Sequence, residues 1–270
     1  NDYEKDKEIE KKSVPFIFTR KKNIVNNQLK GIDDFFKSIN DLRSAKYRYN
    51  ESKQLYYERK YHLTAEKAKN EFIADSTSLS IVLDSFRSKY PFTTSKDSLW
   101  KKYIDVYEDP RKIKDWILHK NIVSQISKNR WSEGIYDISI DSIISNRVKI
   151  NQGQVPIIVK KQDFNSLEVA WIKAKEEYNN KVSLDDPFSD IGYDIIVEFM
   201  IPNLLFDRKL TLSNQRLSIK QVPRSKGVVL ERELIVDANI RITEDVLQKL
   251  NSLTIAIDNQ HKGGSLNNIW

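Results

Sequence analysis

The sequence contains no cysteine, and this absence removes several classes of protein at once. Without thiols the chain has no disulfide scaffold, no thiolate metal site and no cysteine nucleophile. A reducing cytosol and a cysteine-poor cell envelope both fit this composition, so cysteine usage alone leaves the compartment open.

Glycine and histidine are scarce as well, with seven and three residues in 270. None of the glycines has the spacing of a phosphate-binding or dinucleotide-binding loop, which disfavours most nucleotide-binding enzymes. The three histidines, His62, His119 and His261, are far apart and lack ligand neighbours at helical spacing. We therefore expect no catalytic site, no metal and no cofactor.

Long apolar runs are also missing, because no stretch approaches the roughly 18 apolar residues of a membrane span. The chain starts at Asn1 and its only methionine is Met200, so we expect a segment upstream of Asn1. Residues 1–23 open with mixed charges and are interpreted as a solvated tether. These features predict an extracytoplasmic or periplasmic protein with an anchor upstream; a cytoplasmic or organellar location is the alternative.

Charge divides the chain near residue 130. Residues 1–130 carry 28 Lys and Arg against 19 Asp and Glu, whereas residues 131–270 carry 17 against 19. The hydrophobic period changes from helical to alternating at the same place. The sequence thus predicts two regions of different structural class.

A heptad stripe is the main feature of the first region. Apolar residues recur every seven positions from Phe35, and the first two of them are each preceded, three positions earlier, by an isoleucine. The resulting set is Ile32, Phe35, Ile39, Leu42, Tyr49, Tyr56 and Leu63. Such a stripe packs on another helix, either in an intramolecular hairpin or in a self-associating coiled coil. We expect a helical bundle with one long arm over residues 24–130, with Pro91 ending one helix and Asp109-Pro110 starting another.

The second region, residues 131–262, alternates between apolar and polar residues over several short runs. The clearest are residues 193–201, 210–219, 230–242 and 253–257. Alternation of this kind predicts an antiparallel, sandwich-like β domain, and a helix over residues 167–178 is expected to cover it. The predicted fold class is therefore α+β, with residues 263–270 as a flexible C-terminal exit.

Three weaker features are candidate contact sites. Bases interleaved with tyrosines, at Lys46, Arg48, Arg59 and Lys60, have the mixture that nucleic acid would need. Apolar residues at the end of the chain, Leu266, Ile269 and Trp270, are interpreted as a docking segment. The aspartates Asp185, Asp186, Asp190 and Asp194 allow a calcium site, although ordinary turns and caps are favoured.

These observations favour a non-enzymatic structural or interaction subunit of a larger, membrane-anchored envelope assembly. Its expected partners are other proteins or a second copy, with no small-molecule substrate. The alternative is a nucleic-acid-associated or ribosome-associated protein, possibly organellar, that uses the basic helical half.

Overall fold

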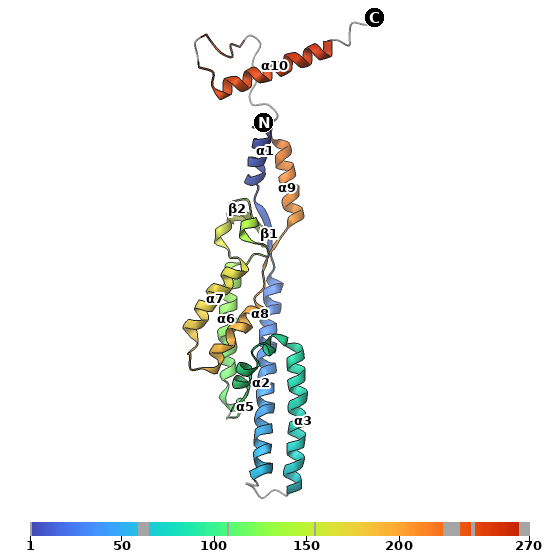
Figure 1. The fold of residues 1–270 in the computed structure, drawn as a ribbon, viewed down its shortest axis with the longest axis vertical. Coiled ribbons are helices and arrows are strands. Elements are labelled where there is room, and N and C mark those ends of the chain that lie inside the picture. The colour runs from blue at the N-terminus through green and yellow to red at the C-terminus, as the bar shows by residue number, and fades with distance from the viewer. Residues whose placement is uncertain are drawn as a thin grey trace. The chain divides into compact units, whose positions relative to one another are not determined.

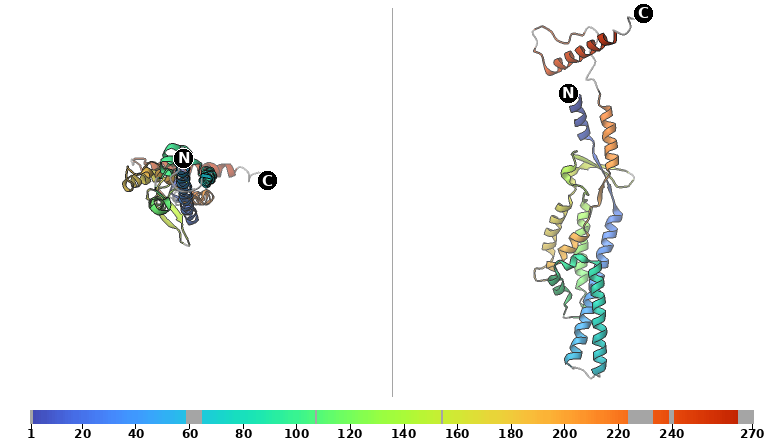
Figure 2. Two further views of the ribbon diagram at one scale, coloured as in Figure 1. Left: turned by 90° about the horizontal axis from the view of Figure 1, so that it is seen from below. Right: turned by 45° about the vertical axis from the view of Figure 1, so that its right-hand side comes forward.

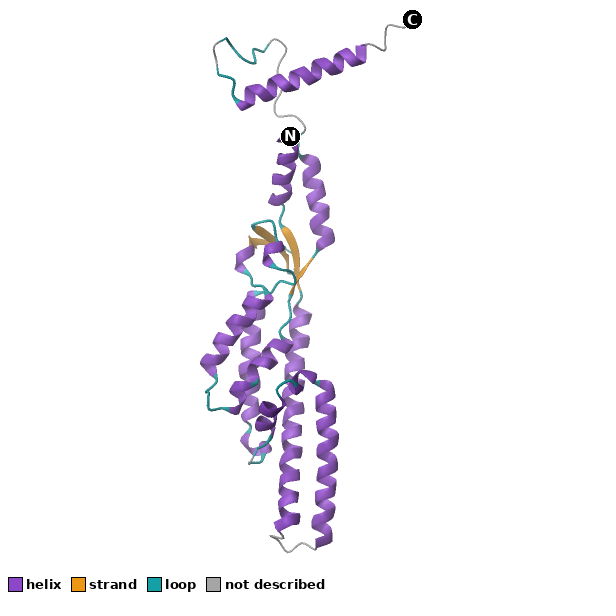
Figure 3. Cartoon of the chain, in the orientation of Figure 1, coloured by secondary structure: helices purple, strands orange, loops and turns teal. Residues whose placement is uncertain are grey.

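The computed structural model describes residues 2–58, 65–106, 108–153, 155–223, 233–238 and 241–264. The chain forms two compact units, one of Lys7–Lys220 and one of Asn1–Asp6 with Gln221–Trp270. Helices dominate the described residues (Figure 3). They are α1 (Asp2–Ser13), α2 (Lys22–Glu58), α3 (Ala65–Lys89), α4 (Asp97–Ile104), α5 (Pro110–Ile113), α6 (Asp115–Glu133), α7 (Leu167–Lys181), α8 (Gly192–Phe199), α9 (Arg208–Gln221) and α10 (Glu244–Gly264).

Helices α2 and α3 run side by side as a long antiparallel hairpin (Figures 1 and 2). The α2 residues that face inward follow the heptad stripe, because a seven-residue repeat keeps one face of a helix against its neighbours. Helix α3 ends at Lys89, and Pro91 begins the short 3-10 helix η1 (Pro91–Thr94). The predicted stop at Pro91 is therefore confirmed.

Phe35 on α2 lies at the centre of the larger hydrophobic core. Its ring contacts six other aromatic rings at centroid distances of 4.8 to 6.1 Å, those of Phe36, Phe86, Tyr90, Phe92, Trp100 and Phe199. Helices α6, α7 and α8 complete this core, and α6 contacts α2, α7 and α8. Aromatic rings of this size dominate core energetics, so this cluster fixes how α2 meets the rest of the bundle.

The predicted helix start at Asp109-Pro110 is also confirmed. Asp109 caps α5 by accepting a hydrogen bond from the backbone N–H of Arg111, and Pro110 takes the first position. The helix stops after one turn because Lys114 has a left-handed backbone, with φ of 54°. Helix α6 begins again at Asp115, so the expected single helix is two helices with a bend between them.

The sheet is small and mixed. It has four strands, β1 (Phe16–Arg20), β2 (Arg147–Asn151), β3 (Ile157–Lys160) and β4 (Leu204–Phe206), in the order β3-β2-β1-β4. β1 pairs parallel with β2 and antiparallel with β4, and β2 pairs antiparallel with β3. A second hydrophobic cluster around Phe18, Tyr136 and Val148 covers the sheet.

The predicted antiparallel β-sandwich is wrong. Residues 192–199 form α8, residues 208–221 form α9 and residues 244–264 form α10. Of the expected strand over residues 230–242, residues 233–238 and 241–242 are described and belong to no strand, and the others lie outside the described residues. The fold is a predominantly helical α+β arrangement.

Two local signals explain the error. The inward side of α8 carries Gly192, Ile195, Ile196 and Phe199, whose spacing is one face of a helix. Asp207 accepts a hydrogen bond from the backbone N–H of Leu210 and so caps α9, the helix that residues 210–219 form in place of the predicted strands. The expected helix over residues 167–178 is present as α7, but it packs on α6 and α8 and does not cover a sheet.

The opening segment is also structured. Residues 1–23 were expected to be a tether, yet they contain α1 and then β1, whose Phe16, Ile17 and Phe18 are buried. β1 has partner strands on both sides, so an early segment forms an inner strand of the sheet. Of the expected C-terminal exit, residues 263–264 end α10 and residues 265–270 lie outside the described residues.

Candidate functional site

A cleft of about 650 Å³ opens beside α2, α4 and the segment that joins α4 to α6. Its volume falls within the range of small-ligand sites, about 300–1,000 Å³. Polar and apolar side chains share its surface. The lining residues are Arg43, Lys102, Tyr103, Asp105, Val106, Glu108, Ile113, Asp115, Asp186 and Pro187.

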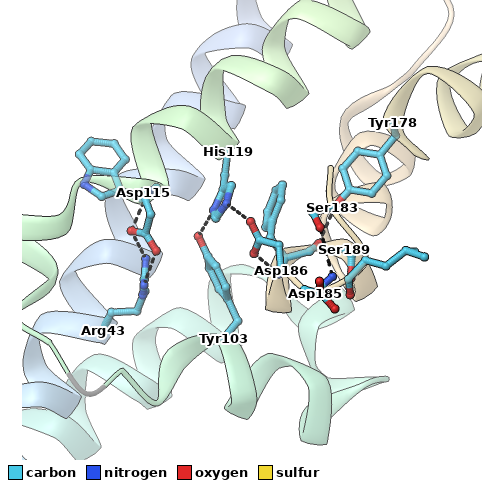
Figure 4. A network of polar contacts seen from close by, with 12 residues as sticks. Arg43, Tyr103, Asp115, His119, Tyr178, Ser183, Asp185, Asp186 and Ser189 are labelled. Atoms are coloured by element: carbon cyan, nitrogen blue, oxygen red, sulfur yellow. Dashed lines mark hydrogen bonds and ion pairs between the residues drawn. The ribbon is translucent and has the colours of Figure 1, made fainter. Parts of the chain in front are cut away.

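A two-point ion pair forms part of the cleft wall (Figure 4). Arg43 Nη1 and Nη2 donate to the two carboxylate oxygens of Asp115 at 2.8 and 2.7 Å. The Arg43 guanidinium also lies 4.6 Å from the centroid of the Tyr103 ring. Burial alone would raise the pKa of Asp115, but hydrogen bonds and charge from Arg43 outweigh it and hold that pKa below its ordinary value. The pair therefore fixes α2 against the start of α6.

A second chain of hydrogen bonds runs from Tyr103 through His119 to Asp186 (Figure 4). The Tyr103 hydroxyl is 2.9 Å from His119 Nδ1, and His119 Nε2 is 3.0 Å from Asp186 Oδ2. A carboxylate can only accept, so Nε2 carries the proton and Nδ1 accepts from the Tyr103 hydroxyl. Three elements, α4, α6 and the segment before α8, meet through this chain.

The His119 imidazole is held in its neutral form. Its ring stacks on Phe188 with centroids 4.1 Å apart and planes 7° from parallel. Burial lowers the pKa of His119 and outweighs the opposing hydrogen bond to Asp186. Burial likewise raises the pKa of the Tyr103 hydroxyl, so both groups are uncharged at neutral pH.

Asp186 joins the hydrogen-bond chain to the local backbone. Its Oδ1 accepts from the backbone N–H of Phe188 at 2.8 Å and thereby caps the 3-10 helix η4 (Pro187–Asp190). The side chain is 33% exposed. In the part of the chain that the structure describes, it makes no ion pair with lysine or arginine. Asp186 thus offers a carboxylate to the cleft with only uncharged donors around it.

The geometry suits binding better than acid–base catalysis. A catalytic base must come within hydrogen-bond reach of a substrate proton. His119 is 3% exposed, and both its ring nitrogens already have partners inside the protein. Tyr103 is equally buried, and its hydroxyl is committed to His119. The buried side chains of His119 and Tyr103 therefore support the cleft wall, and a ligand would contact the more exposed residues around them.

The predicted interaction stripe divides into a buried part and a half-buried part. Ile32, Phe35, Ile39 and Leu42 are completely buried in the bundle. Tyr49 and Tyr56 lie farther along the hairpin against α3, where the Tyr56 ring stacks on Phe72 at 5.5 Å. Leu63 is outside the described residues.

The other predicted contact residues are only partly described. Lys46 Nζ lies 3.4 Å from Asp105, and the exposed Arg48 lies 3.9 Å from Asp75. Two more members of the basic patch, Arg59 and Lys60, fall outside the described residues. The C-terminal docking residues, Leu266, Ile269 and Trp270, do so as well.

The aspartates considered for calcium have separate local roles. Asp186 caps η4, whereas Asp194 forms an ion pair with Lys96 at 2.8 Å. Over the described ranges, no three His, Asp or Glu side chains gather closely enough to hold a metal ion. Asp186 thus has the capping role that was favoured, whereas Asp194 joins its segment to Lys96 through an ion pair.

Arg43 is the central residue that the sequence interpretation missed. It stands seven residues after Phe36, and both are buried. A basic residue seven positions after a buried aromatic residue lies on the same buried face of the helix. It indicates a buried ion pair, because burying a charge without a partner there would cost free energy. Its partner Asp115 is 72 residues away in sequence, so the pair could not be assigned from spacing.

Comparison with known proteins places the chain beside a protein family. The model of the 7TMR-HDED family, described as 7TM-HD extracellular, matches residues 1–256. No curated protein and no solved structure gives a significant match to the chain. No helix in the described ranges combines the length and apolar character that crossing a bilayer requires.

Proposed function

The chain belongs to the 7TMR-HDED family, the extracellular domains of 7TM-HD proteins, and from this premise we propose that it is a non-enzymatic recognition domain. The family confirms the predicted extracytoplasmic location, and it supports a membrane-associated role. A domain outside the cytoplasm can serve a membrane-associated protein by binding a ligand or a partner protein on that side of the membrane.

The cleft beside Arg43 and Tyr103 carries the proposal. Its wall is fixed by the Arg43–Asp115 pair and by the hydrogen bonds that connect Tyr103, His119 and Asp186. A wall that is already ordered loses little entropy when a ligand arrives, so such a site is preorganised for binding. The same contacts keep His119 away from a substrate, which supports recognition over catalysis.

The cleft also connects elements that are far apart in the chain. Arg43 comes from α2, Asp115 from α6 and Asp186 from the turn before α8. A ligand that binds one arrangement of these elements more tightly than another shifts the conformational equilibrium toward the first. The size of the shift is set by the difference in its affinity for the two arrangements. We infer that this is how the domain would report a binding event to the rest of its protein.

Protein partners remain part of the proposal, through the α2–α3 hairpin. It exposes large apolar side chains at Tyr57, Ile73 and Ile81, which are 65%, 51% and 64% exposed. Exposed apolar residues mark a protein contact site where they form a contiguous patch, so these three positions are the ones to test for partner binding. Nucleic acid is the less favoured partner, because the domain lies outside the cytoplasm and Lys46 and Arg48 are near aspartates of this chain.

A solute screen with a blocked cleft tests the proposal. The melting temperature of the full 270-residue chain is measured against a library of small polar solutes, alongside Ile113→Trp, which places a bulky ring in the cleft. Ile81→Trp on α3 is the matched control. We expect at least one solute to stabilise the wild type and the control but not Ile113→Trp, since binding to the folded state raises stability by mass action.

Three results would contradict this function. The first is that no solute stabilises the wild type, and the second is that Ile113→Trp responds as the wild type does. The third is chemical conversion of a bound solute, seen by mass spectrometry after incubation, which would make the domain an enzyme.

A further inference from the structure

The cleft has more acidic than basic side chains. Four carboxylates line it, those of Asp105, Glu108, Asp115 and Asp186, against the two basic groups of Arg43 and Lys102. This imbalance alone identifies no ligand, because surface carboxylates are common. The pairing among these residues is more informative.

The strongest cation of the cleft is not available to an anionic ligand. Both terminal nitrogens of Arg43 are bound to Asp115, and one face of its guanidinium lies over the Tyr103 ring. The Arg43 side chain is only 3% exposed. An anion would have to displace Asp115, which is costly for a buried pair. Lys102 is then the only free basic group among the described lining residues.

The acidic side chains are less fully paired. Asp105 lies 3.4 Å from Lys46 Nζ, and Asp115 is neutralised by Arg43. Asp186 receives hydrogen bonds from the neutral His119 ring and from the Phe188 backbone, neither of which carries charge. The exposed Glu108 has no ion pair among the described contacts. Among the described lining groups that have no ion-pair partner, two are carboxylates, Glu108 and Asp186, and one is basic, Lys102. The net unpaired charge of the cleft is therefore negative.

Apolar groups complete the lining. Val106, Ile113 and Pro187 lie among the charged residues, and Ile113 is 39% exposed. Apolar surface in a ligand site is the counterpart of an apolar part of the ligand, and the polar groups set its orientation. A bare metal ion would not use this surface, and the described residues offer no group of three metal ligands.

We infer that the cleft binds an organic cation, an ammonium or guanidinium group on an apolar stem. The cationic head lies near Asp186 and Glu108, and the stem lies against Ile113, Val106 and Pro187. This inference rests on the proposed recognition function and names its ligand class. The head group could belong to a free amine or to a lysine or arginine side chain of another protein.

Three probes that share a five-carbon stem and differ in the charge of the head group test which head group the cleft prefers. Pentylamine, pentanol and pentanoate are titrated into the full 270-residue chain and followed by NMR shifts and calorimetry. We expect saturable binding of pentylamine at Ile113 and Tyr103, at least tenfold tighter than either other probe. Nα-acetyl-lysine amide then separates the sources: binding as tight as pentylamine points to a protein side chain, and much weaker binding points to a free amine.

Charge variants test the placement. Glu108→Gln should weaken pentylamine binding about two- to fivefold, the effect of losing one exposed charge. Lys102→Ala should tighten it by a similar factor, because a like charge is removed. Asp186→Asn should weaken it further, and its circular dichroism spectrum checks that it is folded. Glu66→Gln on α3, outside the cleft lining, is the matched control and should bind as the wild type does.

The inference is overturned if pentanol or pentanoate binds as tightly as the amine, if Ca²⁺ alone occupies the site, or if none of the probes binds. It is also overturned if Glu108→Gln and Lys102→Ala both leave the affinity for pentylamine unchanged. If pentanoate binds and Ile113→Trp abolishes its binding, the cleft does bind a ligand but not an organic cation. That result would contradict the ligand class proposed here and leave the recognition function supported. Failure of the whole solute screen would remove both.

Discussion

Arg43 of α2 and Asp115 of α6 form a two-point ion pair, with donor–acceptor distances of 2.8 and 2.7 Å. The Arg43 side chain is almost fully buried, whereas that of Asp115 is 29% exposed. The two residues join the long helix of the hairpin to the first residue of α6, at the wall of the cleft. Their removal should therefore affect the whole bundle.

Asp115→Asn should lower the free energy of unfolding by about 3 kcal/mol, because it leaves the Arg43 charge buried without its counter-ion. Urea unfolding followed by circular dichroism measures the change. Lys37→Ala is the control, since it breaks an exposed ion pair of α2 with Asp33 and should change the unfolding midpoint little. Equal midpoints for wild type and Asp115→Asn would show that the Arg43 charge is accommodated without its partner.

The buried imidazole of His119 predicts a pH dependence. Burial lowers the pKa of His119 in the folded protein below its ordinary 6.5, so the unfolded chain binds more protons over the interval between the two values. The stabilisation is fully present above about pH 6.5 and is lost as the pH falls through the folded pKa. Urea unfolding between pH 5 and 8 should therefore show the wild type losing stability toward the acidic end.

His119→Asn isolates this contribution, because asparagine does not titrate in that range. Its unfolding free energy should vary less with pH between 5 and 7 than that of the wild type. The lowered pKa of Asp115 acts below about 3.8 and does not interfere. Parallel pH profiles for the two proteins would contradict a neutral, buried His119.

Much of the helical half could be predicted from the sequence. Pro91 and Asp109-Pro110 act through local backbone chemistry, since proline fixes its own φ and excludes helix before it. The positions of Ile32, Phe35, Ile39 and Leu42 follow from a seven-residue period that a single helix maintains. These signals are short-range, so they are visible in one segment of the chain at a time.

The sheet and the cleft could not be assigned in this way. β1 is five residues long and pairs with residues 148–151 and 204–206, so its partners are defined only by the tertiary fold. Helix α8 has apolar residues that satisfy both a strand and a helix pattern over eight residues, and burial against α6 and α7 decides between them. Asp186 similarly reaches His119 from 67 residues away.

The position of β1 predicts that residues 131–270 do not fold alone. That fragment lacks β1, the strand that lies between β2 and β4, and it lacks nearly all of α6, against which α7 and α8 pack. We expect a spectrum of an unfolded or molten chain, with poor NMR dispersion and no cooperative urea transition. Residues 7–220 are the matched control, because they contain one compact unit whole and should unfold cooperatively. A cooperative transition in residues 131–270 would show that the sheet can form without β1.

The packing of α2 predicts the effect of a charge at Leu42. This side chain is completely buried within the core of α2, α3 and α6, and burial of a leucine contributes about 1.5–3 kcal/mol. Leu42→Glu removes that contribution and adds the cost of placing a carboxylate in an apolar site. We expect a loss of several kcal/mol, a large part of an ordinary stability of about 5–15 kcal/mol.

Ile81→Glu supplies the comparison, since Ile81 lies on the outer side of the same hairpin and is 64% exposed. It should leave the melting temperature nearly unchanged, because its side chain is already largely in water. Light scattering on both variants separates packing within one chain from packing between chains. If Leu42→Glu lowers the melting temperature at constant mass, the stripe stabilises the monomer. If it changes the mass and leaves the melting temperature unchanged, the stripe joins two chains, and the intramolecular packing of α2 described above does not hold in solution.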